Sequence, residues 1–532
     1  MGGETIVHHL DACLDAKGNF QFNQSGYPWL THWKLEQGNF VHDKPYFPAD
    51  SFPVYLADEQ RSIDREHRYL ESLKPKTSGI PLVVLLLLFA GIFYTIWYKF
   101  INFRLFKHAI DCIRGIYDNP KDPGEISHFQ ALTAALSATV GLGNIAGVAV
   151  AIGLGGPGAV FWMMLLGFLG MTSKFHECTL GQMYRWIDSQ GRVHGGPKYY
   201  LDRGLNELGY KSLGKILAGI FAIFCVGGSL GGGNMFQANQ SFKAISGELT
   251  KFKWFADFQY LDWAIGIVLA ILVGLVILGG IRRIGNVTAK LVPLMVFIYV
   301  GACLYIIMMH FTQLPAVFKL VFAEAFNLQA GVGGFVGVMV QGIKRAVFSN
   351  EAGIGSAAIA HAAAKTEEPI REGIVALLEP FIDTVVICAM SAFVLIVTGA
   401  YAHPDAGQGV EMMRFAFHSK LAWFPTILSL SVFFFAYSTM ISWSYYGEKA
   451  WTYLFGHSSG SVNTYKIIFL ICIVLGTVSS LDNVITFSDL MILAMAFPNI
   501  LGGIWLAKKV RRALQEYMAK LKAGKFQRYG NH

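Results

Sequence analysis

Charged residues are scarce in this chain, and several common signals are missing. Asp, Glu, Lys and Arg make up 15% of its 532 residues, whereas 54% are hydrophobic. Apolar runs long enough to cross a bilayer, about 20 residues each, exclude a soluble protein. The seven cysteines form no CxxC pair or Cys/His cluster, which excludes a zinc site or a disulfide framework. No basic start followed by an apolar stretch lies near Met1, so we expect no signal peptide.

Two further classes are disfavoured. The net charge of +8 comes from basic residues at the ends of apolar segments and in the C-terminal tail, not from one soluble face. We interpret this basicity as membrane topology rather than as a nucleic-acid site. The sequence shows no nucleophile with a base and no metal cluster, so we expect neither an enzyme nor a cofactor. Nothing in the sequence indicates a protein partner.

Hydropathy predicts an all-α polytopic membrane protein with about eleven spanning helices. The predicted spans are 80–100, 128–154, 157–184, 214–240, 261–282, 287–311, 329–356, 370–400, 422–447, 464–481 and 482–507. Basic loops around 99–121 and 185–211, together with the basic tail 508–532, predict a cytoplasmic C-terminus facing anionic lipid. An odd number of helices then places the polar extension 1–79, with its charged run 57–73, outside the cell. The membrane domain is 80–510.

A glycine-rich interruption inside the second predicted span is the main functional signal. Residues 137–147 read Ser-Ala-Thr-Val-Gly-Leu-Gly-Asn-Ile-Ala-Gly. A helix broken within hydrocarbon must satisfy its free backbone groups with a ligand, an ion or a protein-lined cavity. Broken helices of this kind form the binding sites of secondary transporters. Close helix crossing is the alternative, and we favour it for Gly147 alone.

A weak two-fold pattern agrees with this interpretation. When the helix at 80–100 is set aside, the remaining ten split into repeats 128–311 and 329–507, inserted in opposite directions. Both repeats open with a glycine-interrupted helix, and we predict the second break near Gln341 and Gly342.

Several motifs in order resemble the alanine or glycine:cation symporter family. They begin with residues 131–147 and 155–163, and continue with Gly-Gly-Pro-Lys-Tyr-Tyr at 195–200 and the segments 233–239, 348–353, 359–366, 378–384 and 438–448. Met164 stands where the family usually has a second tryptophan, and Leu142 where it often has threonine. The resemblance implies sodium-driven import of alanine or glycine across the cytoplasmic membrane of a bacterium. It also implies a fold shared with the neurotransmitter:sodium symporters and the amino acid-polyamine-organocation transporters.

The resemblance also implies binding residues. The backbone N–H groups of Leu142 and Gly143, at a helix N-terminus, are expected to hold the substrate carboxylate. The remaining substrate residues are Asn144, Gln237, Val338, Gln341 and Gly342. Sodium is expected at the carbonyls of Ser137 and Val140 and at the hydroxyls of Ser438 and Thr439. Bonding of those two hydroxyls back to their own helix remains the alternative.

Charged residues within the apolar segments are interpreted as inner-gate ion pairs. They are Lys174, Glu177, Lys344, Arg345, Glu351, Lys365, Glu379 and Asp383. Static helix–helix pairing is an equally open alternative. Glu379 and Asp383, one helical turn apart, could instead relay a proton, so a proton-coupled amino-acid symporter remains an alternative. A transporter-like amino-acid sensor is a second alternative. His176 and His361 are interpreted as packed polar residues.

Overall fold

The computed structural model describes residues 33–36, 39–42, 81–327, 331–420 and 424–529, and divides the chain into two compact units, Met1–Gly79 and Ile80–His532. In the first unit β1 (Trp33–Glu36) pairs antiparallel with β2 (Asn39–His42), with Trp33 opposite His42. The predicted charged run at 57–73 lies outside the described residues.

The described residues of the second unit form helices, a short hairpin of β3 (Trp186–Ile187) with β4 (Val193–His194), and an isolated bridge between Ile126 and Ala364. The helices of its first part are α3 (Leu82–Trp97), α4 (Ile101–Arg104), α5 (Phe106–Ile113), α6 (His128–Thr139), α7 (Ala146–Gly155), α8 (Ala159–Met183), α9 (Pro197–Tyr199), α10 (Leu205–Glu207), α11 (Lys211–Leu230), α12 (Phe236–Leu249), α13 (Lys253–Ala256), α14 (Leu261–Ile277) and α15 (Gly280–Met309). Those of its second part are α16 (Leu314–Ala325), α17 (Gly331–Asn350), α18 (Ala357–His361), α19 (Pro369–Ala376), α20 (Leu378–Pro380), α21 (Ala389–Val397), α22 (Val410–His418), α23 (Phe424–Phe455), α24 (Ser459–Val478), α25 (Leu481–Ala494) and α26 (Ala496–Lys522).

Many of these helices have the length and apolarity of membrane spans. In the described residues six helical segments pass both criteria: Lys211–Leu249, Gly280–Met309, Pro369–Val397, Phe424–Phe455, Ser459–Val478 and Leu481–Lys522. A seventh is added if α6 and the segment Leu142–Gly155, bent by 57° from each other, count as one broken span. The helices α3 and α14 are apolar but shorter. The protein is therefore a multi-pass membrane protein, while the number eleven and the five-plus-five repeat stay predictions.

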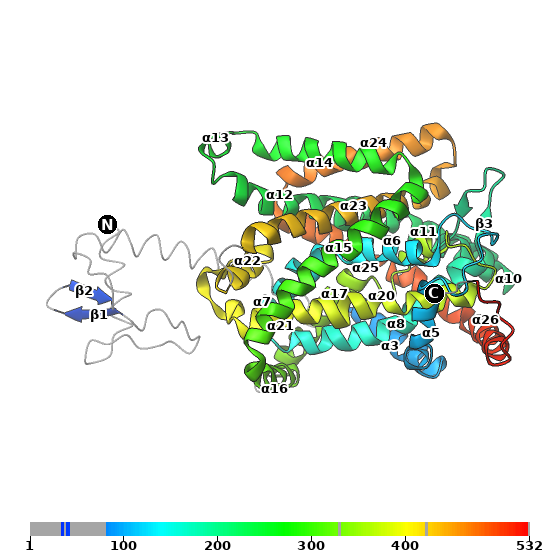
Figure 1. The fold of residues 1–532 in the computed structure, drawn as a ribbon, viewed down its shortest axis with the longest axis horizontal. Helices are drawn as coiled ribbons and strands as arrows, with labels where there is room; N and C mark the ends of the chain where they lie inside the picture. Colours follow the sequence, from blue (N-terminus) through cyan, green and yellow to red (C-terminus); the bar gives the residue numbers. More distant parts are fainter. Residues whose placement is uncertain (1–32, 37–38, 43–80, 328–330, 421–423, 530–532) are drawn as a thin grey trace. The chain divides into compact units, whose positions relative to one another are not determined.

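The basic loops gather at one end of this bundle. Figure 1 shows α5, β3 and α10 at one end, and α13, α16 and α22 at the other. Arg282, at the start of α15, reaches the first end, where its Nε lies 3.9 Å from Glu125. Arg185 donates hydrogen bonds there to four backbone carbonyls, including that of Thr366. We call this the basic end of the bundle.

The predicted position of the second break is wrong. The helix α17 is continuous through Gln341 and Gly342. A Cβ on Gly342 would lie 2.5 Å from the carbonyl oxygen of Ala159, so this glycine permits a close crossing of α17 and α8. The break comes after Asn350, where Glu351, Gly353 and Gly355 have positive φ values of 56°, 90° and 83°. Glycine adopts that region without steric cost, and two of the three positions hold it. The helices α16 and α22 were not predicted from the sequence.

Candidate functional site

The first break has a local cause in the sequence. α6 ends at Thr139, and a short 3₁₀ turn at Leu142–Asn144 separates it from α7. The side chain of Asn144 closes this turn, because its Oδ1 accepts a hydrogen bond from the N–H of Gly141 at 3.0 Å. All these residues are buried. The break therefore exposes a helix N-terminus to the protein interior, where free N–H groups favour an anion.

Gln237 lies directly against that N-terminus. Its Oε1 accepts a hydrogen bond from the N–H of Leu142 at 3.4 Å, and its Nε2 donates a hydrogen bond to the carbonyl of Gly232 at 3.0 Å. The glutamine follows a π-helical stretch, Gly231–Met235, that interrupts the long segment from α11 to α12. A widened helical turn of this kind is common at functional sites.

A small cavity lies between Gln237 and the break. Its volume is about 10 Å³, which is the scale of one water molecule. An amino acid can enter only if neighbouring side chains move. The cavity is lined by Ala138, Thr139, Gly141, Gly143, Gly232, Gln237, Phe348, Glu351, Trp443 and Ile492.

Three of the expected sodium residues lie together. The hydroxyl of Ser137 donates to the carbonyl of Ser438 at 2.6 Å, and Oγ1 of Thr439 lies 3.0 Å from the carbonyl of Ser137. The hydroxyls of Ser438 and Thr439 also contact the carbonyl of Phe435 in their own helix, at 2.9 and 3.0 Å. Val140 is buried one residue beyond the end of α6. Uncharged oxygens thus converge where α23 crosses the break, and the back-bonding alternative is also present.

Asp383 lies at the break, where its hydrogen-bond partners are Asn144, Ser349 and Thr384. Its Oδ1 accepts a hydrogen bond from Nδ2 of Asn144 at 2.6 Å, and its Oδ2 accepts from the hydroxyls of Ser349 and Thr384 at 2.7 and 2.8 Å. Both polar atoms of the Asn144 amide are therefore engaged within the protein. This arrangement ties the break to α17 and to the π-helical stretch Phe381–Cys388.

Of the other predicted intramembrane charges, Lys174, Glu379 and Arg345 form ion pairs across helices. Lys174 on α8 donates to Glu379 at 2.9 Å, and both side chains are fully buried. Arg345 on α17 contacts Asp489 on α25 at 2.8 Å. Glu351 accepts hydrogen bonds from the indole of Trp443, at 2.9 Å, and from Ser356. Lys344 is half-buried on α17.

The remaining predicted substrate residues lie away from the cavity. Val338 and Gln341 face the last residue of α7, Gly155, where a Cβ would lie 3.2 Å from Cβ of Gln341. Gly342 faces Ala159, as described above. Conversely, Phe348, Trp443 and Ile492 line the cavity and were not predicted. Phe348 and Trp443 lie inside the motifs quoted above, but apolar residues in apolar helices carry no signal of their own.

Comparison with known proteins identifies a matching family and several similar proteins. The sodium:alanine symporter family matches residues 65–530. A sodium/alanine symporter of Methanococcus maripaludis is 40% identical over 430 residues, 80% of this chain and 92% of that protein. An uncharacterised transporter of Haemophilus influenzae is 37% identical over 84% of this chain and 94% of that protein. The solved structure of MhsT in complex with L-phenylalanine aligns with a TM-score of 0.48 at 16% identity, covering 72% of this chain and 88% of that chain.

Proposed function

The chain belongs to the sodium:alanine symporter family, and on this premise we propose that it imports a small neutral amino acid, alanine or glycine, by sodium-coupled symport. The family consists of membrane transporters of amino acids and is not an enzyme class. Sodium is the coupling ion that the family implies. The broken helix beside Gln237 is the observation that carries the proposal. Its free N–H groups and adjacent amide offer a zwitterion both donors and acceptors.

In this proposal the substrate carboxylate binds the N–H groups of Leu142 and Gly143. The Oε1 of Gln237 already approaches the N–H of Leu142 at 3.4 Å, so a carboxylate oxygen would replace that contact. Asn144 holds the turn in shape through Asp383 rather than contacting the substrate. Phe348 and Trp443 limit the volume beside the substrate side chain. A site of this kind favours a hydrogen or methyl side chain, although one methylene is worth only about 1–3 kcal/mol in an apolar pocket.

Sodium binds in this proposal where α6 meets α23. The ligands are the carbonyls of Ser137 and Val140 and the hydroxyls of Ser438 and Thr439. Oxygen ligands without a full charge bind an ion weakly enough for release. Because Ser137 lies in α6 only four residues before Gly141, ion binding there stabilises the same break that receives the substrate, which makes ion and substrate binding cooperative.

Alternating access requires ion pairs that open in turn. We assign Lys174–Glu379 and Arg345–Asp489 to that role, with Lys344 and Glu351 beside them. The basic end of the bundle faces the cytoplasm, because basic loops mark the inner side. The tail 508–532 is then cytoplasmic, and the extension 1–79 lies on the outer side of the membrane.

Uptake into proteoliposomes tests the proposal. The purified chain is reconstituted, and accumulation of labelled alanine is compared under an inward sodium gradient, an equal potassium gradient and an imposed proton gradient. Accumulation with sodium alone is expected. Accumulation driven by protons alone would favour the proton-coupled alternative, and binding without accumulation would favour an amino-acid sensor.

Two variants test the binding residues. We expect Gln237→Ala and Thr439→Ala each to abolish sodium-driven uptake while the protein remains folded. The matched controls are Gln240→Ala, a buried amide three residues along the same helix, and Thr452→Ala, a buried threonine on α23 that bonds to the carbonyl of Lys449. Wild-type uptake in both test variants would refute the assignment.

A further inference from the structure

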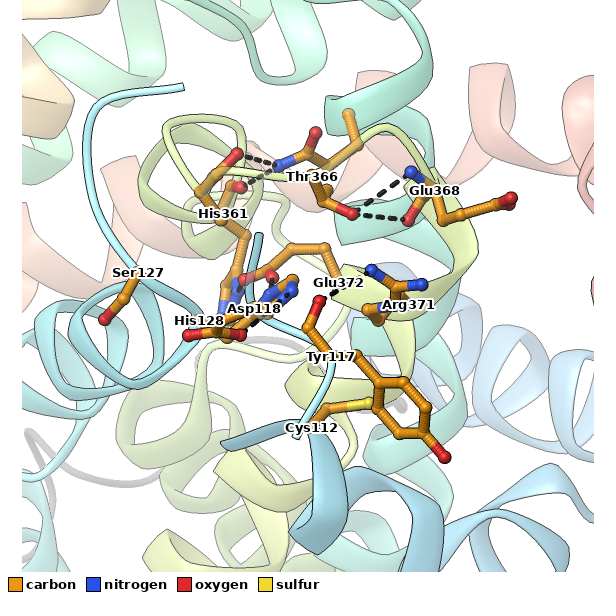
Figure 2. Close-up of polar contacts among 12 residues, drawn as sticks. Cys112, Tyr117, Asp118, Ser127, His128, His361, Thr366, Glu368, Arg371 and Glu372 are labelled. Carbon is orange, nitrogen blue, oxygen red and sulfur yellow. Dashed lines mark hydrogen bonds and ion pairs between the residues drawn. The ribbon is translucent and has the colours of Figure 1, made fainter. Parts of the chain in front are cut away.

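Six ionisable side chains form a buried chain at the basic end of the bundle. In spatial order they are Asp118, His128, Glu372, His361, Glu379 and Lys174. They come from the segment before α6, from α6 itself, and from α19, α18, α20 and α8. Figure 2 shows the imidazoles of His128 and His361 meeting the same carboxylate, Glu372. We call this set the imidazole–carboxylate chain.

The contacts in the chain are close at its centre and longer on either side. Nδ1 of His128 contacts Oε2 of Glu372, and Nδ1 of His361 lies 2.5 Å from Oε1 of the same carboxylate. The other nitrogen of each imidazole faces a second carboxylate at 3.7 Å, Asp118 for His128 and Glu379 for His361. Glu379 is in turn 2.9 Å from Lys174.

Each of the two 3.7 Å distances separates a pair of atoms that have no other hydrogen-bond partner among the described residues. Among the described residues, Nε2 of His128 and Oδ1 of Asp118 are buried and make no hydrogen bond. The same holds for Nε2 of His361 and Oε2 of Glu379. Orphaned buried polar atoms are costly and call for an explanation. Here they occur as two facing pairs, and the distance between the two atoms of each pair exceeds that of a hydrogen bond by less than about 1 Å.

The charges of the chain balance when both imidazoles are protonated. With neutral imidazoles, the three carboxylates and Lys174 leave a net charge of −2. With two imidazolium ions the net charge is zero, and burial then costs far less. Only Asp118 is partly exposed, at 33%, whereas the other five side chains are at most 1% exposed. The other ionisable groups facing the chain are Asp111, Cys112, Asp122, Cys178, Glu177, Arg185, Glu351, Arg371 and Asp383.

We propose that the imidazole–carboxylate chain is a proton-binding site that locks the start of the broken helix α6 to α18 and α19. His128 and His361 each hold a proton on Glu372 while the basic end is closed. Movement of α6 away from α19 separates His128 from Glu372 and releases protons through Asp118, the exposed member. His361 thereby has a role beyond the packed polar residue that the sequence favoured.

This site makes transport depend on the pH at the basic end. The closed form binds more protons than the open form, so raising the pH there favours opening and lowering it favours closure. The inference rests on the proposed symport and on the cytoplasmic position of this end. It adds a pH-regulated lock and does not require protons to drive uptake.

The test is sodium-driven alanine uptake with the pH inside the proteoliposomes varied from about 6 to about 9, at fixed outside pH and a fixed sodium gradient. We expect the wild-type initial rate to rise about threefold or more across this range. In Glu372→Gln and His361→Gln, uptake should persist and its dependence on internal pH should be lost. The control is His176→Gln, because His176 is buried on α8 outside the chain and contacts Tyr98 and Gly503.

The outcomes separate this inference from the proposed function. A wild-type rate independent of internal pH, or equal pH profiles in wild type and both variants, overturns the proton site. If the wild-type protein shows no sodium-driven uptake at any pH, that result contradicts the symport proposal instead. In that case the same variants are compared by thermal unfolding in detergent across the pH range. The stability that Glu372 gains from imidazolium ions should decline with rising pH in wild type and not in Glu372→Gln, and parallel curves would overturn the site.

Discussion

A methyl group at position 141 tests whether the contact between α6 and α23 holds the coupling ion. The backbone of Gly141 is extended, with φ at −127°, so alanine is not strained there. However, its Cβ would lie 2.5 Å from Oγ1 of Thr439, whereas ordinary contact begins at 3.4 Å. The hydroxyl must therefore move by about 0.9 Å and lose its 3.0 Å contact with the carbonyl of Ser137.

The expected effect follows from displacing a proposed sodium ligand, because a Thr439 hydroxyl that has moved by this distance no longer reaches the ion in the same geometry. Losing one oxygen contact of this kind costs about 1–3 kcal/mol. We therefore expect Gly141→Ala to raise the sodium concentration for half-maximal uptake by about tenfold, equivalent to about 1.4 kcal/mol.

Sodium titration of alanine uptake measures this shift, with thermal unfolding in detergent to verify folding. The control is Gly147→Ala, a glycine of the same segment where a Cβ meets nothing within 4 Å. It should leave the sodium dependence unchanged. An unchanged half-saturation in Gly141→Ala, or an equal shift in Gly147→Ala, would refute the reasoning.

Three further predictions concern stability. Burial lowers the pKa of Lys198 to about 7, so the unfolded chain binds more protons between pH 7 and pH 10 and wild-type stability should rise with pH in that window. Lys198→Met should remove this slope and raise the melting temperature in detergent. Gly342→Val should lower that temperature, because its side chain enters the α17–α8 crossing at a cost of about 1–3 kcal/mol. Lys174→Met should destabilise by about 3–5 kcal/mol by removing the nearest cation from buried Glu379, and adding Glu379→Gln should restore most of the loss.

Each stability prediction has a contradicting outcome in the same melting curves. A pH slope that persists in Lys198→Met assigns the slope to another group. A Gly342→Val protein as stable as wild type shows that α17 and α8 can separate without cost. Strictly additive losses in the double variant show that Lys174 and Glu379 do not interact.

The sequence by itself determined the class of protein, the family and the first break. Membrane spans follow from composition, because long apolar runs have only one stable environment. The break at Leu142–Asn144 is likewise local, since Gly141 and the Asn144 cap lie within four residues of each other. The same local logic failed at Gly342, where a glycine serves a helix crossing and the real break follows Asn350.

Only the tertiary structure decided which side chains meet. Asp383 joins Asn144, 239 residues away, and His128 joins Glu372, 244 residues away. One helical turn between Glu379 and Asp383 suggested a shared role, yet each binds a different set of partners. Pairings between distant segments depend on how whole helices pack, and neither hydropathy nor spacing along one helix carries that information.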